Sequence, residues 1–216
     1  MTPTVDSAVL ERAAVVIPAY NHGPQLGGVL LKTRELGLPI FVVDDGSTDE
    51  TAEVARGFAG VRLLSHGANR GKGAALLTGF AAAAPAADWA ITVDADGQHH
   101  PADGLRLLQA VTPGEPALVV GNRRGMAHDN VPWTSRFGRG FSNFWVAVSG
   151  GPRLRDTQSG LRVYPVPEVL TLRPRGRRYQ FEVEILALAR LHGIPVREVD
   201  VSVRYRPGGE RVSHFR

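Results

Sequence analysis

The sequence predicts a mixed α/β protein with a doubly wound, mainly parallel β-sheet. Two features of the chain support this fold class. Short apolar segments alternate with longer amphipathic or Ala-rich segments, and several apolar segments end in polar residues followed by glycine. The 216 residues suffice for one domain with a sizeable core, and no linker or repeat divides them. We therefore expect a single domain over residues 1–216, with a ligand-binding half at about 13–122 and a smaller half at about 123–216.

Strands and helices alternate in order along the first half. The expected strands cover residues 13–20, 39–43, 61–65, 90–94 and 117–120. The expected helices run from Pro24 to Gly37, from a capping box at Ser47 and Glu50 to about Phe58, from Gly73 to about Ala84, and onward from Pro101. This alternation is typical of parallel strands joined by crossover helices.

The second half is less regular. We expect a polar turn at residues 156–160, a short strand at 161–164, a helix at 181–191, a strand at 196–205 and a polar tail at 206–216. Residues 131–148 predict a helix with five aromatic residues at three- and four-residue spacing, namely Trp133, Phe137, Phe141, Phe144 and Trp145. Such a stripe fits either a helix packed on the sheet or a helix lying in a membrane surface.

The composition limits the class of protein. The hydrophobic fraction of 43% is ordinary for a globular chain, and no apolar segment approaches the roughly 20 residues that span a bilayer. The absence of cysteine excludes disulfides and thiolate metal sites. The first residues lack the basic and apolar regions of a signal peptide, so a cytoplasmic location is expected.

The charge is distributed unevenly. Residues 1–108 carry 8 Lys and Arg against 12 Asp and Glu, whereas residues 109–216 carry 17 against 9. Arginine suits planar, bidentate recognition of phosphate. The basic second half therefore suggests an anionic substrate or an anionic membrane surface.

Two carboxylates end the fourth expected strand. Asp94 and Asp96 lie two residues apart, so in extended chain their side chains project to the same face and converge. A divalent cation such as Mg²⁺ or Mn²⁺, with substrate phosphates completing its shell, suits such a pair. A solvated Asp-rich turn is the alternative interpretation.

Polar residues also follow the earlier strands. Asn21 follows the first strand, Asp44 and Asp45 follow the second, and Arg70 and Lys72 lie in a glycine-containing segment before a helix. Ligands of open parallel sheets bind at the carboxyl ends of the strands, and helix N-termini suit phosphate. The pattern predicts a nucleotide diphosphate ligand. A dinucleotide-binding oxidoreductase is disfavoured, because the first turn lacks Gly-x-Gly-x-x-Gly.

Several motifs in the same order resemble those of family 2 glycosyltransferases of the GT-A fold. They are residues 16–21, 42–47, 69–73 and 94–98. Residues 156–162, 181–184 and 199–211 resemble the dolichyl- and polyprenyl-phosphate sugar transferase branch of that family, and the resemblance spans roughly residues 13–215. It implies a UDP- or GDP-linked sugar donor and inversion at the anomeric carbon.

The resemblance also implies roles for single residues. Asp94 and Asp96 would place the metal on the diphosphate, Gln98 would lie near the sugar or in the metal shell, and Arg211 would close over the diphosphate. Asp96 and Gln98 are therefore candidate catalytic residues, together with Asp156. The implied donor-binding residues are Pro18, Tyr20, Asn21, Asp44, Asp45, Arg70, Lys72, Asp94 and Arg211. His22 stands where this branch often has glutamate, which leaves the nucleotide base open.

The acceptor decides whether a general base is needed. A phosphate monoester is already ionised near neutral pH, whereas a sugar hydroxyl needs a carboxylate within hydrogen-bond reach. Asp156 occupies the family position closest to that role, as a base or as an orienting group, and a turn cap is the alternative. Arg123, Arg136 and Arg139 are candidate anchors for an acceptor phosphate, with solvated surface arginines as the alternative.

The sequence as a whole predicts a metal-dependent, inverting hexosyltransferase that moves a sugar from a nucleotide-sugar to a polyprenyl phosphate. We expect it to be cytoplasmic and peripheral to the inner face of the membrane, without a nucleic-acid partner. A transferase acting on a hydroxyl of a lipid or glycan, and a non-catalytic nucleotide-sugar-binding protein, remain as alternatives.

Overall fold

The computed structural model describes residues 4–123, 154–156 and 159–202 of the chain. The expected aromatic helix at 131–148, the expected tail at 206–216 and the site candidates Arg136, Arg139 and Arg211 lie outside the described residues. Among the residues described, no helix is long and apolar enough to cross a membrane.

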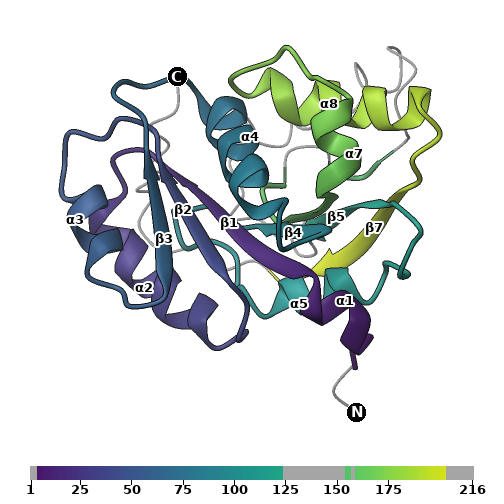
Figure 1. Cartoon of the computed structure of the whole chain (residues 1–216), viewed down its shortest axis with the longest axis horizontal. Helices are drawn as coiled ribbons and strands as arrows, with labels where there is room; N and C mark the ends of the chain where they lie inside the picture. Colours follow the sequence, from purple (N-terminus) through teal and green to yellow (C-terminus); the bar gives the residue numbers. More distant parts are fainter. Residues whose placement is uncertain (1–3, 124–153, 157–158, 203–216) are drawn as a thin grey trace, which may run out of the picture.

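The fold is built on one seven-stranded sheet with the order β3-β2-β1-β4-β6-β5-β7 (Figure 1). The strands are β1 Ala13–Ala19, β2 Ile40–Asp44, β3 Val61–Ser65, β4 Trp89–Thr92, β5 Leu118–Arg123, β6 Arg162–Pro165 and β7 Val196–Val201. β1 pairs in parallel with β2 and β4, β2 with β3, and β5 with β7. Among these strands only β6 is antiparallel to its neighbours, β4 and β5. The mainly parallel α/β fold is confirmed, with one reversed strand that the sequence pattern did not predict.

Helices cover both faces of the sheet (Figure 1). On one face lie α1 Ser7–Glu11, α2 Gly23–Arg34, α3 Thr51–Arg56 and α5 Asp103–Leu108, and on the other lie α4 Lys72–Ala83, α7 Val166–Thr171 and α8 Gln180–Leu191. Successive side chains of β1 serve opposite faces: Ile17 packs in the core that contains Leu30 of α2, and Val16 packs in the core that contains Phe80 of α4. Every residue of β1 and β2 is buried, as expected for strands covered on both faces.

The predicted capping box at Ser47 is wrong. α3 begins at Thr51, and Glu50 is its flanking residue without a side-chain cap. The Ser47 hydroxyl instead accepts a hydrogen bond from the backbone N–H of Asn21 at 2.9 Å, and Oδ1 of Asp49 accepts one from the N–H of Thr51 at 3.0 Å. A contact between two loops has overridden the local capping pattern.

The strand before the two carboxylates is shorter than predicted. β4 ends at Thr92, two residues before Asp94, and Asp96 lies in a turn. The two side chains therefore project from the chain after the strand, and the same-face argument from extended backbone does not apply to them. The sequence pattern also missed α1 and α7, which have five and six residues.

Candidate active site

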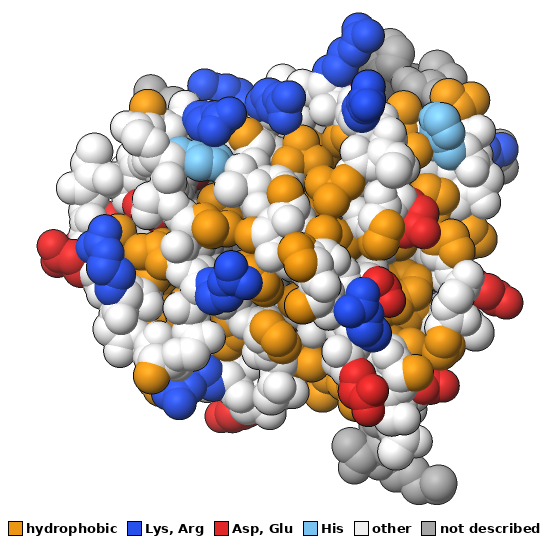
Figure 2. Space-filling view, in the orientation of Figure 1, with side chains coloured by type: hydrophobic (Ala, Val, Ile, Leu, Met, Phe, Trp, Pro, Cys, Tyr) orange, Lys and Arg blue, Asp and Glu red, His pale blue; other side chains and the backbone are white. Residues whose placement is uncertain are grey.

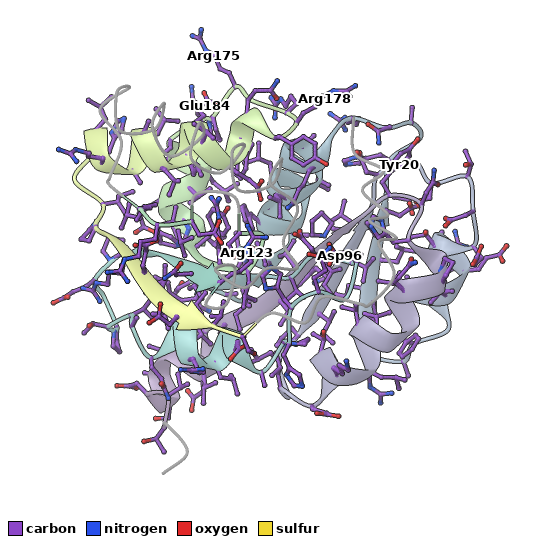
Figure 3. All side chains as sticks on the ribbon, turned by 180° about the vertical axis from the view of Figure 1, so that it is seen from behind. Tyr20, Asp96, Arg123, Arg175, Arg178 and Glu184 are labelled. Carbon is purple, nitrogen blue, oxygen red and sulfur yellow. The ribbon has the colours of Figure 1, made fainter. Side chains whose placement is uncertain are left out.

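The carboxyl ends of three parallel strands meet at one edge of the sheet. β1 and β2 end together at Ala19 and Asp44, and β4 ends beside Val16 of β1. The segments that follow these strands carry the polar residues predicted for the site. Figure 3 shows Asp96 and Arg123 near the middle of the molecule, at the same level of the view.

A buried lysine joins two carboxylates at this edge. Nζ of Lys72 lies 2.7 Å from Oδ1 of Asp94 and 2.9 Å from Oε1 of Glu182, and 7% of the lysine side chain is exposed. Lys72 begins α4 and Glu182 lies in the first turn of α8, so three separate segments meet here. Sequence reasoning missed a role for Glu182, although the motif at 181–184 was a signal. A contact of Lys72 with donor phosphate stays a prediction.

Asp94 also lies against the backbone of the turn before β6. Gly160 approaches so closely that an added Cβ would overlap the Asp94 carboxylate, so a larger residue there would displace this carboxylate. Oγ1 of Thr92, the last residue of β4, donates a hydrogen bond to the Gly160 carbonyl at 2.8 Å. The lysine and this turn together fix the position of the Asp94 carboxylate.

Asp94 and Asp96 have pKa values shifted in opposite directions. Burial and the neighbouring charge of Asp94 raise the pKa of Asp96 above its ordinary value. Burial also disfavours charge on Asp94, but the Lys72 ammonium outweighs burial and lowers the pKa of Asp94. Oδ1 of Asp96 accepts a hydrogen bond from the backbone N–H of half-buried Gln98 at 2.9 Å. The pair thus concentrates negative charge in a partly buried place.

Asp94 and Asp96 fit a divalent cation that arrives with a phosphate ligand. In the part of the chain that the structure describes, no three His, Cys, Asp or Glu side chains gather as a complete metal site. A hard cation such as Mg²⁺ usually takes only one or two carboxylates from the protein and completes its shell with phosphate oxygens and water. Asp94 and Asp96 provide such a donor set, since burial of Asp96 and the charge of Asp94 raise the pKa of Asp96 and a bound cation would offset both effects.

Asp45 is fully buried, and its carboxylate is occupied by the chain itself. Oδ1 accepts the backbone N–H of Arg70 at 2.9 Å and lies 2.6 Å from Nδ1 of His66, while Oδ2 accepts the N–H of Gly71 at 2.7 Å. These bonds hold the segment that carries exposed Arg70 and buried Lys72 at the edge of the sheet. The donor-binding role that the resemblance implies for Asp45 stays a prediction.

Asn21 and Asp44 stabilise the loops after β1 and β2. Oδ1 of Asn21 accepts the N–H of Thr48 at 2.8 Å, and Oδ1 of Asp44 accepts the N–H of Ser47 at 3.0 Å. Asn21 has a φ of 54°, a left-handed conformation that asparagine adopts more readily than most residues. Of the other donor-site candidates, Pro18 is buried within β1 and Tyr20 is half-buried after it.

Asp156 and Arg123, two predicted site residues, form a bidentate ion pair. Nε of Arg123 donates to Oδ2 of Asp156 at 2.5 Å, and Nη2 donates to Oδ1 at 2.9 Å. Asp156 is fully buried, and Arg123 is the last residue of β5, three residues beyond the predicted end of that strand. Both carboxylate oxygens of Asp156 are therefore engaged.

Two further side chains, Glu198 and the buried Arg162, support the segment around Asp156, and sequence reasoning found neither. Oε1 of Glu198 in β7 accepts the backbone N–H groups of Arg155 at 2.7 Å and of Asp156 at 3.2 Å. The fully buried Arg162 donates Nε to the carbonyl of Ser159 at 2.8 Å and Nη1 to the carbonyl of Glu182 at 3.0 Å. The alternation at 196–205 predicted a strand, but not that one of its carboxylates would hold a segment 42 residues away.

A neutral histidine completes the charged cluster. His99 is 5% exposed, and its Nδ1 has no hydrogen-bond partner among the described residues. Burial lowers the pKa of His99 to about 4; the charge of Asp94 opposes this shift, and the charges of Arg123 and Lys72 add to it. The imidazole is therefore uncharged at neutral pH.

Two solved structures with a similar fold define the class of fold. The chain matches a mannosyltransferase from Pyrobaculum calidifontis in complex with GDP-Man and Mn²⁺ with a TM-score of 0.64 and 20% identity, over 97% of this chain and 61% of that one. It matches mannosyl-3-phosphoglycerate synthase from Rubrobacter xylanophilus with a TM-score of 0.63 and 19% identity, over 90% of this chain and 67% of that one. The fold is that of GT-A glycosyltransferases, as expected.

Residues 14–166 match the model of the family described as Glycosyl transferase family 2, and the chain belongs to this family. It is 36% identical over 197 residues to an uncharacterized protein of Methanocaldococcus jannaschii, covering 88% of this chain and 81% of that one. It is 30% identical over 213 residues to UDP-N-acetylglucosamine–dolichyl-phosphate N-acetylglucosaminyltransferase of Methanococcus voltae, covering 88% and 85%. It is 30% identical over 223 residues to polyprenol monophosphomannose synthase of Mycolicibacterium smegmatis, covering 92% and 80%. The resemblance to the polyprenyl-phosphate branch is confirmed.

Proposed function

We propose that this family 2 glycosyltransferase moves a sugar from a nucleotide-sugar to a polyprenyl phosphate at a membrane surface, with inversion at the anomeric carbon. The assignment of the acceptor rests on the ion pair between Arg123 and Asp156. A hydroxyl acceptor needs a general base, but both oxygens of Asp156 accept hydrogen bonds from Arg123. A phosphate monoester has a second pKa of about 6, so it reacts as an anion without a base. The observed pair therefore favours a phosphate acceptor.

The donor diphosphate is assigned to the edge that holds Asp94, Asp96 and Lys72. The two aspartates would hold Mg²⁺ or Mn²⁺, which neutralises negative charge developing on the leaving diphosphate. Lys72 adds a cation at the first residue of α4, where the helix N-terminus also favours phosphate. Pro18, Tyr20, Asn21, Asp44, Asp45, Arg70 and Arg211 are proposed to surround the nucleotide and the diphosphate.

The acceptor phosphate is assigned to Arg123. Because Asp156 holds the guanidinium by two hydrogen bonds, the cation keeps one orientation toward an incoming anion. We retain the proposal from sequence that Arg136 and Arg139 are further anchors for the acceptor phosphate. We also retain the proposal that Gln98 lies near the reacting sugar.

The relatives support the class of acceptor but leave the sugar open. The Methanococcus voltae relative is named for N-acetylglucosamine and dolichyl phosphate, and the Mycolicibacterium smegmatis relative is named for mannose and a polyprenol. Both names contain a polyisoprenoid acceptor, whereas the sugars differ. The sugar and the nucleotide must therefore be found by experiment.

A donor and acceptor screen tests the proposal. The protein is incubated with UDP- and GDP-sugars, Mn²⁺ or Mg²⁺, and a short polyprenyl phosphate or the matching polyprenol, and products are identified by mass spectrometry. We expect a glycosylated polyprenyl phosphate and no product from the free alcohol. Transfer to the alcohol but not to the phosphate would overturn the acceptor assignment, and nucleotide-sugar binding without any transfer would indicate a non-catalytic protein.

Asp156→Asn tests the proposed role of the Arg123–Asp156 ion pair in orienting Arg123 toward the acceptor phosphate. The amide retains the shape of the side chain but removes the charge that orients Arg123, so we expect turnover to fall about 100-fold while donor affinity stays near normal. Asp88→Asn is the matched control, because Asp88 forms a similar two-bond pair with Arg12 on the surface, at 3.0 and 2.7 Å. Normal turnover in Asp156→Asn would reduce Asp156 to a turn residue.

A further inference from the structure

The loop between α7 and α8 carries a concentration of positive charge that the proposed reaction does not use. Residues 172–179, here called the arginine loop, read Leu-Arg-Pro-Arg-Gly-Arg-Arg-Tyr and contain four arginines and no acidic residue. All four arginines are exposed. Figure 2 shows basic side chains gathered along the upper edge of this view, above the helices α4 and α8. The feature is a strongly cationic surface beside the site.

The arginine loop has a conformation fixed by specific contacts. The carboxylate of Glu184 accepts the backbone N–H groups of Arg175 at 2.9 Å and of Gly176 at 2.5 Å. An added Cβ on Gly176 would lie 2.8 Å from Oε2 of Glu184, so a larger residue would disturb this contact. The carbonyl of Arg177 accepts the N–H of Ala74 in α4 at 3.0 Å. The loop therefore presents its arginine side chains from a fixed backbone.

Three of these arginines form no ion pair with any of the residues that the structure describes. Within the described residues, no carboxylate lies within ion-pair distance of Arg173, Arg175 or Arg177. The carboxylate of Glu184 accepts hydrogen bonds from the backbone of the loop rather than from its arginine side chains. These three charges are consequently available to an external anion, and burying them in a neutral partner would be unfavourable.

The same three arginines line an open groove with an apolar floor. The groove has a volume of about 480 Å³, and its lining residues are Leu77, Leu170, Arg173, Pro174, Arg175 and Arg177. Tyr179, at the end of the loop, is 42% exposed. Cationic groups next to apolar and aromatic side chains are typical of protein surfaces that enter the headgroup region of a bilayer.

The arginine loop borders the proposed active site. Its Arg177 carbonyl is bonded to Ala74, two residues after Lys72, and it leads directly into α8, whose Glu182 binds Lys72. In Figure 3, Arg175 projects from the top of the molecule and Arg178 lies below it, above the level of Asp96. A surface that binds this loop would therefore lie next to the proposed active site.

We propose that the arginine loop docks the protein on an anionic lipid bilayer, with lipid phosphates held by Arg173, Arg175 and Arg177 and the site opening toward the membrane. The choice of a bilayer rests on the proposed lipid-linked acceptor and on the apolar floor of the groove. The charge of each arginine near an anionic leaflet adds to the attraction, which falls as salt screens it. Docking by this loop brings a membrane-bound acceptor phosphate to the site without detaching its lipid.

Vesicle flotation of the full chain tests the docking surface. We expect binding to vesicles of phosphatidylcholine mixed with phosphatidylglycerol at low salt, weaker binding at high salt and none to phosphatidylcholine alone. Arg173→Ser/Arg175→Ser/Arg177→Ser should weaken binding to the anionic vesicles by at least about tenfold. The triple lysine variant at the same positions retains the charges and should bind like wild type. Failure of wild type to bind, or binding only to a nucleic-acid oligomer, would overturn the proposal.

A matched triple variant separates this loop from general charge. Lys32→Ser/Arg34→Ser/Arg56→Ser removes the same number of exposed cations from α2 and α3, on the opposite face of the sheet. We expect it to bind anionic vesicles within about twofold of wild type, because distant charges are screened at this range. An equal loss in both variants would show non-specific attraction and would overturn the proposal.

An activity assay with two acceptors distinguishes this proposal from the proposed function. The arginine-loop serine variant should glycosylate a short, water-soluble polyprenyl phosphate as wild type does, and should act at least about tenfold more slowly on a long-chain acceptor in anionic vesicles. An equal loss on both acceptors would place the loop in the active site rather than at the membrane. If wild type transfers to neither acceptor, the proposed function fails, while the flotation result still decides the docking surface.

Discussion

Two pairs of carboxylates lie at the carboxyl ends of β2 and β4, the strands on either side of β1, and the chain uses them differently. In the first pair, Asp45 accepts two backbone hydrogen bonds and contacts His66. In the second pair, the described bonds of Asp96 are limited to one N–H in its own turn, and burial with the charge of Asp94 raises its pKa. A carboxylate whose oxygens accept hydrogen bonds from the protein holds the neighbouring segments in place. A carboxylate that is repelled by a neighbouring carboxylate and accepts few hydrogen bonds is suited to bind a cation.

The comparison first predicts a large difference in stability. Asp45→Ala removes a fully buried carboxylate that accepts the N–H groups of Arg70 and Gly71 and contacts His66, so we expect a loss of about 3 to 5 kcal/mol in the free energy of unfolding. Urea denaturation followed by circular dichroism measures it. Asp96→Ala is the control and should change stability by less than about 1 kcal/mol, because Asp96 satisfies only one backbone group. Similar losses in both variants would remove the distinction drawn between the two pairs.

The second prediction concerns binding rather than stability. Asp96→Ala removes a proposed oxygen ligand of the cation, so the affinity for a nucleoside diphosphate in the presence of Mn²⁺ should fall about 100-fold, while the affinity without metal should change little. Isothermal titration calorimetry with and without Mn²⁺ measures both values. Unchanged metal-dependent affinity would exclude Asp96 as a ligand and favour the alternative interpretation of the pair as an Asp-rich turn.

The same contrast shows how far the sequence could predict the molecule. Buried apolar runs such as those of β1 and β2 are local signals, and the strands formed where they were expected. The contacts of Asp45 depend on His66 and Arg70, which are 21 and 25 residues away, so no local pattern could assign them. Ser47 had the spacing of a helix cap, yet its hydroxyl bonds the N–H of Asn21.

The remaining differences between the sequence-based predictions and the structure arise from contacts between segments that are far apart in the sequence. β6 enters the sheet between β4 and β5 in the reverse direction, and this arrangement brings the turn with Gly160 against Asp94. Direction within a sheet depends on the packing of whole elements rather than on the residues of one strand. Asp156 and Arg123 were each predicted for the site from motifs, but their mutual ion pair became visible only in three dimensions.

The third prediction concerns pH, and it uses the buried imidazole near Asp94. Burial lowers the pKa of His99 to about 4 from 6.5, so the folded state favours the neutral form. The stability associated with neutral His99 is therefore fully present above pH 6.5 and is lost as pH falls toward 4. The free energy of unfolding should fall by about 2 kcal/mol between pH 7 and pH 5 for this reason. His99→Gln should reduce this pH dependence of unfolding, whereas His192→Gln, at an exposed position, should not. Equal pH dependence in wild type and His99→Gln would mean that His99 is already protonated or accessible to solvent.

The fourth and smallest predicted effect extends the comparison to a carboxylate outside both pairs. Glu198 resembles Asp45 in that its Oε1 accepts two backbone N–H groups, those of Arg155 and Asp156, and so it should position Asp156 rather than contact substrate. Glu198→Ala should lower kcat about tenfold with KM for the donor nearly unchanged, because it loosens the segment that orients Asp156 and Arg123. Glu198→Gln should recover most of the loss, since an amide oxygen accepts the same two hydrogen bonds. A loss as large in the glutamine variant as in the alanine variant would show that the charge of Glu198 matters and that its role is not limited to holding the backbone.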